Sequence, residues 1–246
     1  MKSSQKKIVK LFATLLIISS FIAIYKGSYS ISIIDLAFGN LEEIQEFVIL
    51  NIRIPRVILA GFVGCSLALS GACLQGLFRN PLADPGLIGV SSGAALGAAT
   101  SIVIGAEIAP NNYINSFFLP LSAILGSIFV IIILSVITKG FKKSNITYLI
   151  LAGIAINSFA GVGIGILTYI SDDAELRGLT FWSMGSFEGI SWSLIIPSIL
   201  LIFLTTIWTL TFSRKLDIIQ LGENDAHRLG IDVKKLKKNI IISSAI

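Results

Sequence analysis

The sequence predicts an all-α polytopic membrane protein, and three observations carry the prediction. Hydrophobic residues make up 54% of the 246 residues and charged residues only 13%, about half of the roughly 25% that is usual in soluble domains. The apolar residues gather into long stretches instead of spreading along the chain. Short basic clusters separate these stretches, which is the usual arrangement in multi-spanning membrane proteins.

Six of the apolar stretches are long enough to cross a bilayer. A helix needs roughly 20 residues to span a hydrocarbon core of about 30 Å, whereas a β-barrel strand would be shorter and would alternate in polarity. The first stretch could also be a signal peptide, but Tyr25-Lys26-Gly27 is a poor cleavage site, which favours an uncleaved helix. The expected spans cover residues 8–25, 56–78, 87–106, 116–138, 147–170 and 192–212, and a seventh begins at 239–246.

The distribution of Lys and Arg predicts the orientation of the spans. With the N-terminus in the cytoplasm, 15 of the 19 basic residues fall on the inside, as the positive-inside rule requires. We therefore expect a multi-pass protein of the bacterial cytoplasmic membrane with a cytoplasmic N-terminus. Residues 26–55 and 171–191 then form long outer segments, and the polar stretch 213–238 lies inside.

Residues that could carry chemistry are scarce in the spans. The six complete spans hold no Asp, Glu, Lys, Arg or His away from their ends, whereas ion-coupled carriers normally need such a group near the membrane midplane. This favours an energy source on another chain, although a stand-alone channel or ion-coupled carrier remains the alternative. Cys65 and Cys73 lie in one apolar stretch as packing residues. With a single histidine in the chain, no protein-built metal site is expected.

Small residues lie on one face of several spans. Gly89, Gly93 and Gly97 recur at four-residue spacing, and small residues let helix backbones approach closely in a membrane. Packing within the subunit is one interpretation of such a face, and a transport pathway or a dimer seam is the other. Both interpretations also apply to Gln75 and Asn157, the main amide side chains of the spans.

A proline-rich turn between the second and third spans belongs to a longer pattern. Residues 79–86 read Arg-Asn-Pro-Leu-Ala-Asp-Pro-Gly, and such residues impose an irregular turn, with Asn80, Pro81, Asp84 and Pro85 as its structural residues. The run Arg53-Ile54-Pro55-Arg56 precedes this turn, and Gly89-Val90-Ser91-Ser92-Gly93 follows it. Together with the later segments 151–155, 181–186 and 221–230, the pattern resembles the FecCD-type permeases of ABC importers over residues 50–235.

The resemblance implies a type II ABC importer permease fold and a function. Members import iron siderophores, haem or cobalamin, so this chain is expected to be a transport subunit for an iron chelate and not an enzyme. The implied partners are a second permease (the same chain or a close paralogue), ABC ATPase subunits and an extracytoplasmic substrate-binding protein, with lipid around them and no nucleic acid. No cofactor is expected on this chain, because ATP and Mg²⁺ would bind to the ATPase.

Three groups of residues match functional positions of the family. Arg53 and Arg56 match paired arginines that meet acidic residues of the binding protein, and contact with lipid headgroups is the alternative. A cytoplasmic coupling loop at 213–238 is expected to contain a short helix, because its apolar residues recur at helical spacing. Its matching residues are Leu221, Gly222, Glu223, Ala226, Leu229 and Gly230.

The third group is the predicted gate or pathway. The inner turn at 144–147 aligns with the cytoplasmic gate of the family, although short polar residues at a helix start are also ordinary caps. The gate or pathway residues are Gln75, Gly93, Asn145, Ile146, Thr147 and Asn157.

The chain is shorter than the permeases that it resembles. It has six complete spans and the start of a seventh, against about ten in the family. We therefore expect residues 1–246 to form a single transmembrane permease domain that is incomplete at its C-terminus. A non-transporting fragment of a permease is a further alternative.

Overall fold

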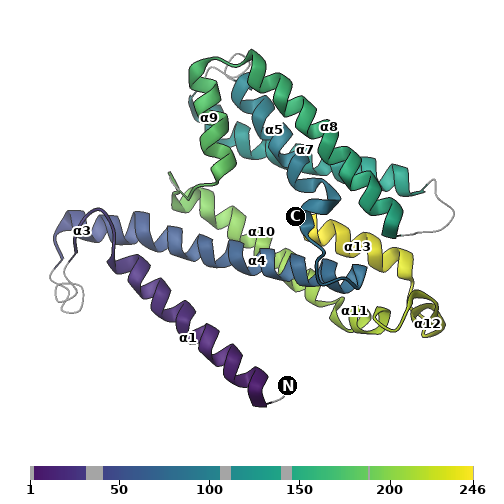
Figure 1. Ribbon diagram of the computed structural model, residues 1–246. Helices are drawn as coiled ribbons and strands as arrows, with labels where there is room; N and C mark the ends of the chain where they lie inside the picture. The colour runs from purple at the N-terminus through teal and green to yellow at the C-terminus, as the bar shows by residue number, and fades with distance from the viewer. Residues whose placement is uncertain (1–2, 32–40, 106–111, 140–145, 188, 246) are drawn as a thin grey trace. The chain divides into compact units, whose positions relative to one another are not determined.

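A computed structural model describes residues 3–31, 41–105, 112–139, 146–187 and 189–245 (Figure 1). Every regular element in these residues is a helix, which confirms the all-α prediction. The chain divides into two compact units, residues 1–65 with 187–202 and residues 66–186 with 203–246. The assignment of the whole chain to one permease domain stays a prediction.

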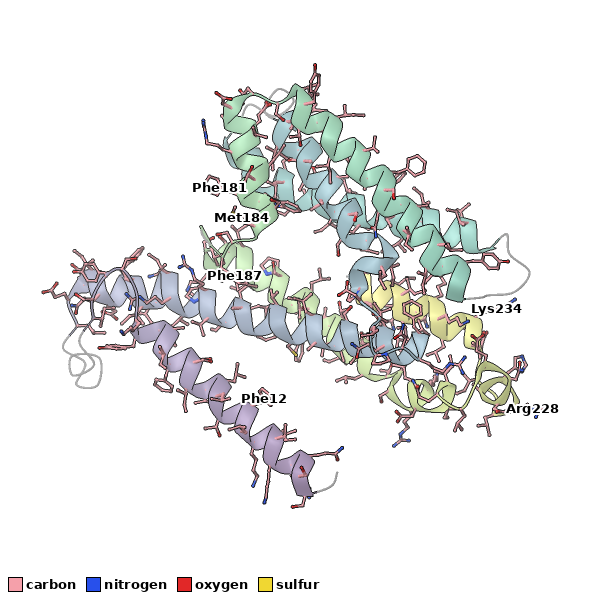
Figure 2. All side chains as sticks on the ribbon, viewed as in Figure 1. Phe12, Phe181, Met184, Phe187, Arg228 and Lys234 are labelled. Carbon is pink, nitrogen blue, oxygen red and sulfur yellow. The ribbon has the colours of Figure 1, made fainter. Side chains whose placement is uncertain are left out.

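Long apolar helices dominate both units. Five segments within the described residues are long and apolar enough to cross a membrane, and most of their side chains face outward (Figure 2). Lipid offers backbone groups no hydrogen-bond partner, so such segments satisfy those groups internally as helices. The five are α1 (Ser3–Tyr25), α4 (Ile54–Phe78) with the helical turns from Glu43 before it, α7 (Asn112–Lys139), α8 (Ile146–Ile170) and α10 (Trp192–Leu210).

The third predicted span, residues 87–106, takes a different form and corrects the expected number. Its residues form a 3₁₀ helix, η2 (Pro85–Ile88), and a 14-residue helix, α5 (Val90–Val103). Gly89 separates the two with a left-handed backbone (φ 86°), a conformation that glycine adopts readily. Helix α5 is about 21 Å long at 1.5 Å per residue, so it is shorter than the hydrocarbon core.

The first unit is built around the start of α4. Helix α3 (Glu43–Val48) begins with a capping box between Glu42 and Gln45. It runs through η1 (Ile49–Arg53), a π-helical turn, directly into α4. Helix α1 has no buried residue, so what holds it to η1 is a small number of specific contacts.

The second unit contains a helix bundle around α5 and a separate group of short helices packed at the end of α4. Helix α5 packs against α7 and α8, and α9 (Asp173–Met184) contacts α5. The remaining helices are α11 (Ser213–Ile219), α12 (Glu223–Arg228) and α13 (Val233–Ala245). They share a core with the last turns of α4, in which Leu74, Leu77, Ile219, Leu236 and Ile240 are fully buried.

The region 213–238 is more divided than the sequence predicts. One short helix was expected there, whereas α11, α12 and the start of α13 occupy it (Figure 1). Gly222 (φ 127°) and Gly230 (φ 83°) adopt positive φ values, which most residues avoid. These two glycines break the helical path before and after α12.

Candidate functional site

A π-helical turn sets the geometry at the start of α4, where the two predicted docking arginines lie. The amide of Ile54 donates to the carbonyl of Ile49, five residues back, and Pro55 has no amide hydrogen. The carbonyl oxygen of Leu50 is thus left without its usual helix partner, and Nε1 of Trp192 donates to it at 3.0 Å. The first residue of α10 is thereby tied to the π turn.

Arg53 is buried and holds the end of α1. Its Nη1 donates to the carbonyl oxygens of Ile24 at 2.9 Å and Tyr25 at 2.7 Å, and its Nη2 donates to Tyr29. Gly27 makes room for this guanidinium, because a Cβ there would lie 2.6 Å from Nη2. The last carbonyls of a helix lack intrahelical donors, and a cation is favourable beside them. Arg53 therefore caps the C-terminus of α1.

Arg56 differs from Arg53 in exposure. Its side chain lies at the surface, and its Nε donates to the carbonyl oxygen of Phe187 at 3.1 Å. Arg53 is only 7% exposed, and its donors are committed to backbone carbonyls. Of the two arginines predicted to dock the binding protein, only Arg56 has an exposed side chain.

The turn after α4 is held by side chains as well as by backbone. Helix α4 ends with the amide of Asn80 donating to the carbonyl of Gln75 at 3.1 Å and with Arg79 in a left-handed conformation (φ 51°), which is a Schellman-type ending. Oδ1 of Asn80 then accepts from the amide of Leu82 at 2.9 Å. Oδ1 of Asp84 accepts from the amide of Gly86 at 2.7 Å.

The two prolines of this turn take different positions. Pro85 is the first residue of η2, where the missing amide hydrogen costs no helix bond. Pro81 lies exposed in the turn itself. The side chain of Gln75 is also exposed on α4, and Gln75 does not line the groove beside α5.

Asn157 joins α8 to the two helices that follow this turn. Its Oδ1 accepts a hydrogen bond from Oγ of Ser92 at 2.6 Å, and its Nδ2 donates to the carbonyl of Gly86 at 3.1 Å. Gly153, one turn earlier, has no room for a side chain, because a Cβ there would overlap the carbonyl of Leu87. The contacts support the packing interpretation of Asn157.

Glycines bring α5 and α7 into direct backbone contact. A Cβ on Gly93 would overlap Val130 and lie 2.6 Å from the carbonyl oxygen of Gly126, and a Cβ on Gly97 would overlap the carbonyl of Ser122. Gly93 is also one of the residues that line an apolar groove of about 910 Å³ between α5, α7 and α8. Its first role in the structure is helix packing, as for small residues in membrane helices generally.

The predicted cytoplasmic gate is only partly visible. Asn145 lies outside the described residues. Ile146 and Thr147 are the first two residues of α8, and their side chains lie outside the described part of the chain. The gate assignment therefore stays a prediction.

Helix α12 presents a small exposed surface from the predicted coupling loop. Leu221 is 67% exposed and Leu229 is 62% exposed, at the two ends of the helix, whereas Ala226 is fully buried. The helix closes with the amide of Ile231 donating to the carbonyl of Ala226 at 3.0 Å and with Gly230 in a left-handed conformation. This Schellman ending fixes where the chain turns.

Two side-chain contacts fix this region to its neighbours. Nζ of Lys237 on α13 lies 2.8 Å from Oε1 of Glu223, the first residue of α12. Nε2 of Gln220 donates to the carbonyl of Gly76 on α4 at 2.7 Å. The predicted coupling residues thus belong to a packed structure and not to a loose loop.

No group of three or more His, Cys, Asp or Glu side chains that could hold a metal ion occurs in the described ranges. The absence of a cofactor on this chain stays a prediction. The polar contacts described above position helices relative to one another.

Comparison with known proteins defines the class of this chain as a member of a transport family. Residues 15–246 match the FecCD transport family, and the chain belongs to that family. It is 42% identical over 225 residues to the hemin transport system permease protein HmuU of Yersinia pestis, covering 89% of this chain and 66% of the relative. It is 32% identical over 211 residues to the cobalamin import system permease protein BtuC of Halobacterium salinarum, covering 86% and 55%.

A third relative has another substrate in its name, and a solved structure confirms the fold. The molybdate import system permease protein MolB of Haemophilus influenzae is 31% identical over 250 residues, covering 98% of this chain and 72% of the relative. A solved structure described as an inward-facing metal-chelate type ABC transporter has a TM-score of 0.84 and 31% identity, covering 98% of this chain and 73% of that chain. The chain spans 66% and 55% of the lengths of the hemin and cobalamin permeases.

Sequence reasoning missed several of the residues that organise these sites. No sequence feature singles out Trp192, although Pro55, which has no amide hydrogen, signals an unpartnered carbonyl in the helical turn before it. Lys237 is one of the 15 basic residues expected on the inside, and only its place among the apolar Val233, Leu236 and Ile240 hints that it is buried. Gln220 carried no signal that would distinguish it from an exposed loop residue.

Proposed function

We propose that the chain is the membrane-spanning subunit of an ATP-driven importer that moves an iron chelate across the bacterial cytoplasmic membrane. The observation that carries the proposal is α12, a short helix with exposed leucines at both ends and a fully buried alanine in its middle. A protruding apolar element on a packed base suits insertion into a groove of a partner protein. Membership of the FecCD transport family supports an ABC ATPase as that partner.

The iron chelate rests on the relatives and on the chemistry of the spans. The hemin permease is 42% identical to this chain, against 32% and 31% for the cobalamin and molybdate permeases. The six predicted spans carry no charged side chain away from their ends, which suits a bulky chelate that must pass without tight binding. Haem is therefore the first substrate to test, and iron siderophores are the second.

The proposed assembly has three kinds of partner subunit around the chain. A second permease, either the same chain or a close paralogue, completes the pathway. ATPase subunits bind ATP and Mg²⁺ on the cytoplasmic side, and the positive-inside rule favours the N-terminus and α12 on that same side. A substrate-binding protein docks outside against Arg56, because charge complementarity sets the rate and register of encounter. This chain itself holds no cofactor.

ATP-dependent uptake tests the proposal. The chain is reconstituted in proteoliposomes with its ABC ATPase and its binding protein, and radiolabelled haem is supplied on the binding-protein side. We expect haem to accumulate only with ATP inside, and haem-loaded binding protein to raise ATP hydrolysis several-fold. Uptake that follows a proton or sodium gradient and ignores ATP would establish an ion-coupled carrier and overturn the proposal.

The substrate is tested separately in the same vesicles. Haem, a ferric siderophore and cobalamin are offered in turn, each with the matching binding protein. Accumulation of haem or the siderophore supports the iron chelate. ATP-driven accumulation of cobalamin alone would keep the importer and remove the iron chelate.

A further inference from the structure

Lys237 stands apart from the other basic residues around it. Lys234, Lys235 and Lys238 on α13 are all exposed, whereas Lys237 is only 7% exposed (Lys234 is labelled in Figure 2). Its neighbours on the same helix face are Val233 and Ile240, which belong to the core of the second unit. An ammonium group in such a place needs an ionic partner, because the loss of hydration is otherwise uncompensated.

Glu223 supplies an ionic partner for Lys237. Its Oε1 lies 2.8 Å from Nζ of Lys237, a normal length for a charge-assisted hydrogen bond. The side chain of Glu223 is 35% exposed and that of Lys237 is 9% exposed, so the pair is closed to solvent on the lysine side. The other ion pair in the described residues of this region, between Arg228 and Asp225, is 3.8 Å long and exposed on both sides.

The pair joins two helices that otherwise meet through few side chains. Glu223 is the first residue of α12, and Lys237 lies one turn into α13. Between them, Ala226 packs fully buried against this core, and its carbonyl accepts from the amide of Ile231. Helix α12 has six residues, too few to be stable as an isolated helix. Its orientation therefore depends on these contacts.

Helix α13 is in turn connected to α4 at its far end. Oγ of Ser70 on α4 donates to the carbonyl of Ser244 at 3.0 Å. The end of α11 is connected to α4 by the bond from Gln220 to Gly76. These contacts form a continuous path from α12 through the ion pair to α13, and from there to α4.

We propose that Glu223 and Lys237 form a positioning pair that fixes α12 in the orientation for its ATPase contact and transmits the movement of the ATPase to α13. The inference rests on the proposed function and adds a role for both residues within it. Glu223 acts through Lys237 and points inward, and the surface offered to the ATPase is left to Leu221 and Leu229.

Charge-reversal variants distinguish a positioning role of the pair from direct contact of Glu223 with the ATPase. Glu223→Lys and Lys237→Glu each place like charges at the pair, and the double variant restores an opposite pair. Lys238→Glu, next along α13 and exposed, is the matched control. The readouts are the dissociation constant for the ATPase, the stimulation of ATP hydrolysis by loaded binding protein, and hydrogen exchange of the α12 amides.

The pair predicts a specific pattern. Each single reversal should raise exchange of the α12 amides at least tenfold and cut the stimulation of hydrolysis at least fivefold, and the double variant should recover most of both. Since a reversed single variant can fail to fold, Glu223→Gln with Lys237→Met removes both charges and keeps the volume. That variant should fold and bind the ATPase while its stimulation falls.

Two results would overturn the inference. One is single reversals that match Lys238→Glu in stimulation and exchange. The other is a double variant whose α12 amides are again protected from exchange, but whose ATP hydrolysis is stimulated as little as that of Glu223→Lys. That result would place the carboxylate of Glu223 in direct contact with the ATPase. Failure of the unsubstituted chain to bind the ATPase would contradict the proposed function itself, and the exchange pattern would still test the pair.

Discussion

Nη1 of Arg53 donates to the carbonyl oxygen of Tyr25, the last residue of α1, at 2.7 Å. The two residues are far apart in the sequence, and the contact brings the C-terminal end of α1 onto the π turn before α4. Helix α1 has no buried residue of its own. The guanidinium is therefore its main polar attachment among the described residues of the first unit.

Replacing Arg53 should loosen α1. Arg53→Gln removes a charged group that donates to three carbonyls, and bonds of this kind contribute about 1.5–3 kcal/mol each at most. We expect amides near the C-terminus of α1 to exchange about 10- to 100-fold faster by hydrogen–deuterium exchange in nanodiscs. Arg56→Gln is the matched control, and equal exchange in the two variants would contradict the capping role.

Reversing the charge of Arg56 should weaken docking of the binding protein. Arg56→Glu puts a carboxylate where an exposed cation lay, so the dissociation constant should rise, mostly through a slower association rate. The effect should shrink as salt is raised, because screening shortens the range of the interaction. Surface plasmon resonance at two ionic strengths measures it, and an unchanged, salt-independent rate would remove Arg56 from the docking site.

The bridge at Asn157 should contribute to the stability of the second unit. Asn157→Leu leaves the hydroxyl of Ser92 and the carbonyl of Gly86 without their partner, at a cost of about 1–3 kcal/mol. A lower unfolding midpoint in detergent is expected. Ser158→Ala is the control, because Oγ of Ser158 donates only to Ile154 in its own helix. If both variants melted alike, the bridge would carry no stability.

Gly97 and Gly161 should respond oppositely to alanine. Gly97→Ala forces a methyl group into the carbonyl of Ser122, so α5 and α7 must separate, and overpacking of this kind costs about 1–3 kcal/mol. A Cβ on Gly161 meets nothing within 4 Å, and alanine favours helix there by up to about 1 kcal/mol. Thermal unfolding of both variants checks this, and a tolerated Gly97→Ala would contradict the close packing of α5 on α7.

The long helices could be predicted from sequence because their signal is local. An apolar run such as 147–170 fixes a helix whatever its neighbours are, and α8 covers Ile146–Ile170. The run 87–106 is equally apolar, yet Gly89 adopts a left-handed conformation against α8 and splits it. That outcome depends on a partner helix more than sixty residues away, which periodicity cannot reveal.

The candidate site residues also divide into those that the sequence predicts locally and those that depend on a distant partner. Exposure of Leu221 and Leu229 around the buried Ala226 follows from glycines that the sequence displays. The burial of Arg53 and of Lys237 does not follow, because a charged residue reads as exposed until the carbonyl or carboxylate that pairs with it is known. Both partners, Tyr25 and Glu223, come from other helices.

The most direct test of the account asks whether the end of α12 touches the ATPase. A cysteine replaces Leu229 in a chain whose Cys65 and Cys73 are changed to alanine, and a short crosslinker is added to the assembled transporter. The account predicts a crosslink to the ATPase from position 229 and none from a cysteine at Asp173, the first residue of α9, which is expected on the outer side. An assembled transporter with no crosslink from position 229, or with equal crosslinks from both positions, would contradict it.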